Sequence, residues 1–92
     1  MQLYWKERRA GLSLVIADED GQEIQVGAIR RTPRGYDALA VTTGYDPGRA
    51  TKGIATIEEA RIFVESFQPW NMYDGTEELV VEPEVRPLDQ SA

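Results

Sequence analysis

The sequence contains no cysteine and no histidine. These two absences exclude disulfides, thiolate nucleophiles, Ser/His and Cys/His catalytic pairs, and the common zinc sites, so no cofactor or metal is expected. A chain without cysteine is typical of a reducing compartment, which predicts a cytoplasmic protein. The sequence also lacks a long apolar run and a basic stretch followed by an apolar one, so neither secretion nor a membrane partner is expected.

The chain is also short, with 92 residues. A chain of this size shields only about 60% of its unfolded surface, which leaves room for one core. Its net charge of −6 is unevenly distributed, because residues 1–55 carry eight basic and seven acidic side chains, whereas residues 56–92 carry two basic and nine acidic ones. The sequence therefore predicts one folded domain with two electrically different halves.

Alternating apolar residues dominate the first half of the chain and predict β-strands. The predicted strands are 2–9, 12–17, 24–29 and 36–43, with 52–55 and 77–82 as shorter candidates. Turns at 10–11, 18–21 and 30–35 separate the first four strands. Gly27 interrupts the alternation of the third strand, which predicts a β-bulge there.

The four residues Thr56-Ile57-Glu58-Glu59 form a helix-capping signal. An apolar stripe follows at helical spacing, and its members are Ile57, Ala60, Phe63, Val64 and Phe67. Pro69 then ends the pattern. We expect an α+β fold in which a helix over about 57–68 packs across one face of an antiparallel meander of four to six strands.

The domain is predicted to comprise residues 1–82. Residues 83–92 contain two prolines and few large apolar side chains. Such a composition is typical of a disordered tail.

Arginines lie beside the first and third predicted turns, which an antiparallel meander places at the same end of its sheet. They are Arg8, Arg9, Arg30, Arg31 and Arg34, and the loop at 44–53 adds Arg49 and Lys52. Guanidinium groups bind phosphates and carboxylates through a planar fork of donors. This cluster predicts anion or nucleic-acid contact as one alternative, and ordinary charged turns as the other.

The leading hypothesis is a small non-catalytic protein-binding module that acts through its acidic half. Its candidate contacts are Glu77, Glu78 and Glu82 together with Trp70, Met72 and Tyr73. The last three are residue types enriched in interfaces, and they also fit a segment that closes the core. By analogy, such a protein suits a bacterial, phage or mobile-element accessory or inhibitor of the anti-defence type, as a monomer or small homo-oligomer.

A second alternative is a small enzyme with a carboxylate or Tyr/Arg site at an oligomer interface. Adjacent carboxylates occur at Glu58/Glu59 and Glu77/Glu78, and a nearby pair occurs at Asp18/Asp20. Neighbouring side chains in a strand or helix point apart, and each pair has a surface explanation. The sequence therefore favours a non-catalytic protein over a catalytic one.

Overall fold

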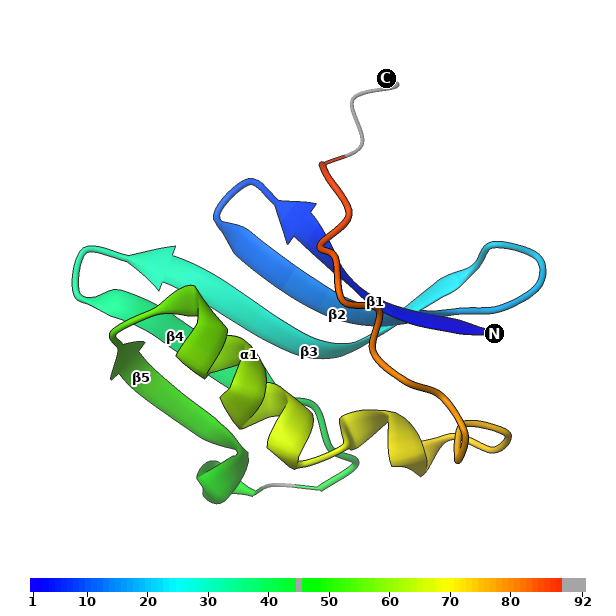
Figure 1. The fold of residues 1–92 in the computed structure, drawn as a ribbon. Coiled ribbons are helices and arrows are strands. Elements are labelled where there is room, and N and C mark those ends of the chain that lie inside the picture. Colours follow the sequence, from blue (N-terminus) through cyan, green and yellow to red (C-terminus); the bar gives the residue numbers. More distant parts are fainter. Residues whose placement is uncertain (45, 89–92) are drawn as a thin grey trace.

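Five β-strands, one α-helix and two short 3-10 helices make up the computed structural model, which describes residues 1–44 and 46–88. The strands are β1 (Gln2–Arg8), β2 (Gly11–Ala17), β3 (Glu23–Thr32), β4 (Gly35–Ala40) and β5 (Ala50–Ile54). They pair in sequence order and all antiparallel, as Figure 1 shows. Helix α1 (Ile57–Ser66) follows β5, while η1 (Pro47–Arg49) and η2 (Pro69–Met72) flank this pair. The predicted α+β meander is confirmed.

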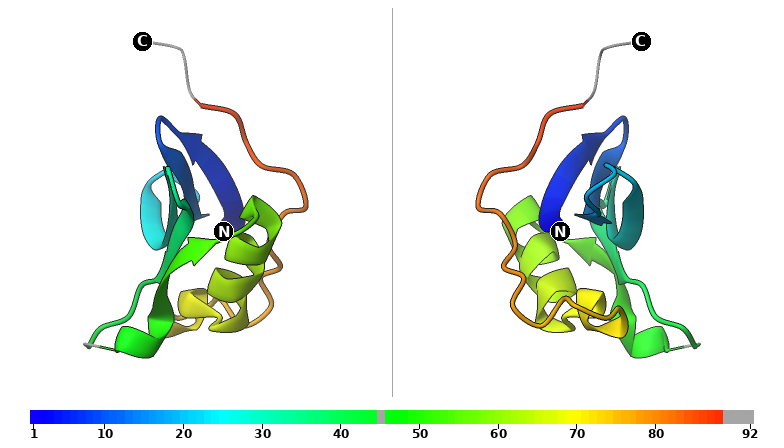
Figure 2. Two further views of the ribbon diagram at one scale, coloured as in Figure 1. Left: turned by 90° about the vertical axis from the view of Figure 1, so that its left-hand side faces the viewer. Right: turned by 90° about the vertical axis from the view of Figure 1, so that its right-hand side faces the viewer.

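Helix α1 lies on one face of the sheet, and the chain after it stays on the same side (Figure 2). The buried core between the two layers consists of Leu3, Trp5, Leu12, Leu14, Ile16, Val26, Ile29, Ala38 and Ala40 from the sheet, Ala60 and Val64 from α1, and Trp70 from η2. Strand β2 is buried along its whole length, on both faces. This burial agrees with its sequence, in which Ser13 is the one polar side chain among apolar residues.

The start of α1 follows the predicted cap. The Thr56 hydroxyl accepts a hydrogen bond from the Glu59 amide at 3.1 Å. The helix ends at Ser66, two residues earlier than predicted, because Gln68 adopts a left-handed backbone with φ 47° before Pro69. Ala60 and Val64 are fully buried, whereas Phe63 and Phe67 pack at the margin of the core, with ring centres 5.1 Å apart.

The predicted bulge lies beside Gly27. Leu14 pairs with Gly27 and Val15 pairs with Gln25, so Val26 is the extra residue on β3. A Cβ built at Gly27 would lie 2.6 Å from Cγ1 of Val64. The absent side chain therefore allows the helix to approach the sheet closely at this point.

The chain after η2 differs from the prediction. Residues 77–82 form no strand. The segment from Glu82 to Arg86 lies along the outer edge of β1, although residues 83–86 belong to the predicted disordered tail. The amide of Glu82 donates to the carbonyl of Leu3 (2.9 Å), that of Arg86 to Trp5 (2.8 Å), and that of Glu7 to Arg86 (2.9 Å). The exposed backbone groups of an edge strand need such partners. Residues 89–92 of the predicted tail lie outside the described residues.

We expect Thr56→Ala to lower the free energy of unfolding by about 1 kcal/mol, because the Glu59 amide loses its capping acceptor. Chemical denaturation measures this difference. Thr56→Ser keeps the hydroxyl and is the control, with no loss of capping free energy expected, because serine caps helices at least as well as threonine. An alanine variant with the wild-type midpoint would contradict the assigned role of the cap.

Gly27→Ala is expected to destabilise the fold by about 1–3 kcal/mol, since the added methyl group would collide with buried Val64. Gly44→Ala is the matched control, because a Cβ at Gly44 meets no atom within 4 Å. Thermal unfolding of both variants tests the contact. A Gly27→Ala protein as stable as the Gly44→Ala protein would show that the helix and sheet are not tightly packed there.

Candidate functional site at the arginine end of the sheet

The β1–β2 turn and the β3–β4 turn lie at the same end of the sheet, on the left of Figure 1. Gly11 pairs with Arg30, and the Arg31 amide donates to the Ala10 carbonyl at 2.6 Å, so the two turns are in direct contact. This end also receives the last residues of β5 and the first turn of α1. We call it the arginine end, and its cationic residues are Arg8, Arg9, Arg30, Arg31, Arg34, Lys52 and Arg61.

These cations line two hollows. Arg30 lines one and Arg31 the other, because successive side chains of a strand point to opposite faces of the sheet. The outer hollow, of about 510 Å³, is lined by Arg30, Thr32, Arg34, Asp37, Lys52 and Gly53. Asp37 is its one lining carboxylate, at 3.6 Å from the Arg30 guanidinium, and it also accepts a hydrogen bond from the Gly53 amide at 3.2 Å. Arg34 and Lys52 have no side-chain partner within residues 1–44 and 46–88.

The inner hollow, of about 410 Å³, lies on the helix side of the sheet and is lined by Arg8, Arg9, Arg31, Arg61, Ile57 and Leu88, among others. Sequence reasoning missed Arg61, which comes from α1. The one available signal was its position four residues after Ile57, which puts both on one side of the helix. The Nε atom of Arg61 is buried and has no hydrogen-bond partner in the structure.

The charge balance of the arginine end is opposite to that of the rest of the molecule. Its seven cations face four carboxylates, those of Glu7 and Asp37 in the hollows and of Glu58 and Glu59 in the first turn of α1. The rest of the chain carries three basic and twelve acidic side chains. The protein is therefore a strong electric dipole whose positive pole is the arginine end.

Arg49 does not join this group, although the sequence placed it among the candidate anion contacts. Its Nη1 donates to the carbonyl of Val41 at 3.0 Å, and its Nε lies 3.7 Å from the Asp46 carboxylate. Its guanidinium also lies over the ring of Phe67, 5.3 Å from the centroid. Arg49 thus connects the loop before β5 to Phe67 at the end of the helix. Lys52, in contrast, lines the outer hollow and remains a candidate anion contact.

The predicted acidic surface is only partly available for a partner. Trp70 is 8% exposed and belongs to the core, so it closes the hydrophobic layer as the alternative interpretation expected. Both carboxylate oxygens of Glu82 pair with the Arg86 guanidinium, at a shortest distance of 2.9 Å. Glu77 and Glu78 are exposed, and Met72 and Tyr73 are half-buried.

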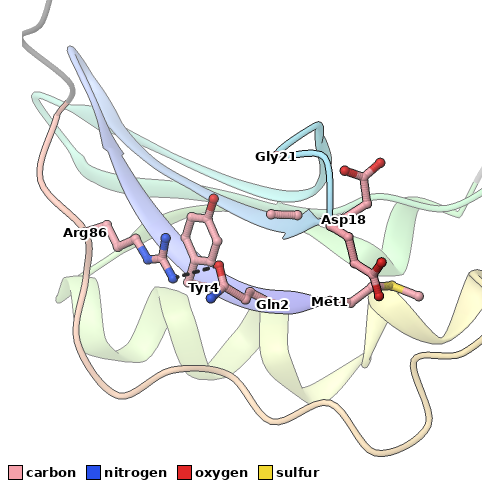
Figure 3. A pocket seen from close by; sticks show the side chains of 8 residues that line it. Met1, Gln2, Tyr4, Asp18, Gly21 and Arg86 are labelled. Carbon is pink, nitrogen blue, oxygen red and sulfur yellow. Dashed lines mark hydrogen bonds between the residues drawn. The ribbon is translucent and has the colours of Figure 1, made fainter.

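Arg86 anchors a separate polar cluster on the helix-free face. Its guanidinium lies 3.6 Å from the ring centre of Tyr4, whose hydroxyl donates to the Glu23 carboxylate. A hollow of about 440 Å³ lies beside Tyr4 and Arg86 (Figure 3). Arg86 already binds Glu82 and Gln2, so its charge is satisfied within the protein.

Burial, together with the hydrogen bond to Glu23, raises the pKa of Tyr4 to about 12. The same hydrogen bond, assisted by Lys6 at 3.0 Å, holds the pKa of Glu23 below its usual value. Tyr4 therefore stays protonated at neutral pH, where it acts as a donor and not as a base.

The carboxylate pairs have structural roles or lie at the surface. Asp18 accepts hydrogen bonds from the amides of Asp20 and Gln22, both at 2.9 Å, and so forms the β2–β3 turn. Within residues 1–44 and 46–88, no three His, Cys, Asp or Glu side chains gather as a metal site would require. No helix in these ranges has the length and apolar character needed to cross a bilayer.

No protein-family model, curated protein or solved structure matches the chain.

The Tyr4 phenol is expected to titrate at about pH 12 in the phenolate absorbance, and Tyr4→Phe should remove that component. Because the folded pKa exceeds the ordinary value of about 10, this group stabilises the fold fully below pH 10, and the stabilisation is lost as the pH rises through 12. Glu23→Gln should bring the pKa closer to 10 but not to it, since burial is the larger cause. A wild-type titration with every tyrosine near pH 10 would contradict the network.

Proposed function

We propose that this protein is a small, non-catalytic nucleic-acid-binding module that holds the phosphate backbone at the arginine end of its sheet. The observation that carries the proposal is the gathering of seven cations at one end, with a single ion pair among them in the described residues. Arg9, Arg31 and Arg34 make no side-chain hydrogen bond or ion pair there. Their donors are free for phosphate oxygens, which guanidinium groups bind in a forked geometry.

The shape of the arginine end supports the same function. The outer and inner hollows lie on opposite faces of the β3–β4 hairpin, so a strand that crosses the tip of the hairpin meets cations on both sides. The acidic remainder of the molecule would be repelled by phosphates, which orients the protein as it approaches. The net charge of −6 then limits non-specific coating of nucleic acid without preventing contact at this end.

A non-catalytic role is consistent with the chemistry of the polar cluster around Tyr4. The Tyr4 hydroxyl donates to Glu23, and the two flanking cations Lys6 and Arg86 are paired with carboxylates. A chain without cysteine also suits the reducing cytoplasm, where nucleic acids lie.

Binding is tested by fluorescence anisotropy with single-stranded and duplex oligonucleotides over a range of salt concentrations. The double variant Arg31→Gln/Arg34→Gln removes two unpaired cations and spares the Arg30–Asp37 pair. We expect it to lose about tenfold in affinity or more at about 50 mM salt. The slope of log K against log salt should also become shallower by about 0.7–0.9 for each lost phosphate contact.

The matched control is Gln22→Glu/Asn71→Asp, which changes the net charge by the same amount at exposed positions outside the arginine end. It should keep the wild-type salt slope and most of the affinity, because distant charges act mainly through screened fields. Equal losses in the two variants would mean that net charge alone governs binding. No measurable binding of the wild type at low salt would refute the nucleic-acid function.

Protein binding through the acidic half is the second candidate, in an accessory or inhibitor role of the bacterial or phage type. The observation in its favour is Val80, which is 81% exposed close in sequence to exposed Glu77 and Glu78. Apolar side chains surrounded by charge are typical of interaction surfaces. In this case Glu77→Lys/Glu78→Lys would abolish capture of a protein partner, whereas Arg31→Gln/Arg34→Gln would leave capture intact.

A further inference from the structure

The inner hollow differs from the outer one in its number of unpaired cations and in the elements that form its walls. Its lining residues include Arg8, Arg9, Arg31 and Arg61 and one acidic residue, Glu7. The Arg8 guanidinium turns to the helix-free face, where its Nε donates to Ser13 at 3.1 Å, whereas Arg9, Arg31 and Arg61 have no side-chain partner among the described residues. The inner hollow therefore has three unpaired arginines, whereas the outer hollow has two unpaired cations, Arg34 and Lys52.

The walls of the inner hollow come from three separate parts of the fold. The β1–β2 turn contributes Arg9, helix α1 contributes Ile57 and Arg61, and the segment after Arg86 contributes Leu88. Apolar side chains and arginines thus line the recess together. Such a recess, with walls from three elements, suits the end of a chain better than a continuous strand, which needs an entrance and an exit.

The buried Nε of Arg61 gives a second reason to expect an anion. A buried donor without an acceptor costs free energy comparable to a lost hydrogen bond, and the cost is larger for a charged group. An oxyanion in the inner hollow would supply that acceptor once the Arg61 side chain turns its Nε toward the opening. Because Arg61 is on α1, the contact would also connect the helix to the two turns.

We infer that the inner hollow binds a terminal phosphomonoester of a nucleic-acid strand. This inference rests on the proposed function and specifies which part of the nucleic acid enters the site. A phosphomonoester carries close to two negative charges at neutral pH and three free oxygens, whereas an internal phosphodiester carries one charge and two. A site with three unpaired arginines and one carboxylate discriminates between them by charge and by the number of acceptors.

The test compares one single-stranded oligonucleotide in three forms, with a 5′-phosphate, with a 3′-phosphate, and with hydroxyls at both ends. We expect one phosphorylated form to bind the wild-type protein about tenfold more tightly than the hydroxyl form, as one or two added charge-assisted hydrogen bonds provide. Arg61→Gln should remove this preference. Because Arg61 is half-buried, Arg9→Gln is the second variant, at an exposed position of the same hollow, and it should reduce the preference as well.

Arg34→Gln is the matched control, since it removes one guanidinium from the outer hollow. It should weaken binding of all three oligonucleotides equally and leave the preference unchanged. Equal wild-type affinity for the three forms would overturn the inference and leave the proposed function standing, whereas no binding of any form would refute the proposed function itself. If adenosine 5′-monophosphate binds as tightly as the phosphorylated oligonucleotide, the ligand is a free nucleotide and the strand-end inference is wrong.

Discussion

The close packing of α1 against β3 is the contact on which the rest of the structure depends. Helix α1 and the chain after it cover one face of the five-stranded meander: Ala60 and Val64 of α1 are fully buried, and Trp70 joins the same core. Gly27, which lies beside the bulge in β3, has no side chain and so leaves room for Val64. The irregularity of the strand and the close packing of the helix therefore occur at the same place. The contact between Val64 and Gly27 thus fixes the position of the helix over the sheet.

The same packing produces the proposed site. Because β5 ends where the arginine-bearing turns lie, α1 begins at that end, and Arg61 lines the inner hollow from the helix. The strong separation of charge between the two ends costs electrostatic free energy within a small domain. An anion at the arginine end would offset that cost, which connects the stability of the fold to the binding we propose.

The sequence predicted much of this fold because the relevant signals are local. The alternation of apolar and polar residues predicted the strands, the Thr56 capping signal predicted the start of the helix, and Gly27 predicted the bulge. Antiparallel topology also brought the first and third turns together, as expected.

The features that the sequence did not predict depend on contacts between distant residues. The Arg86 guanidinium lies over the ring of Tyr4, 82 positions away in the sequence. No local sequence pattern predicts this stacking or the backbone hydrogen bonds between the segment 82–86 and the edge of β1. Arg49 resembles any loop arginine until the loop folds back onto α1 and Phe67. Trp70 and Arg61 likewise acquire their places only from the way the helix lies over the sheet, which tertiary packing decides.

The central claim is that the arginine end is the working surface of this molecule. A titration of the isotopically labelled protein with a short 5′-phosphorylated single strand, followed by amide and arginine Nε–H resonances, tests it most directly. The account predicts that the largest shifts fall on the β1–β2 turn, the β3–β4 turn and the Nε–H of Arg61, while Glu77, Glu78 and Val80 stay unchanged. Shifts confined to residues 72–80, or none at low salt, would contradict it.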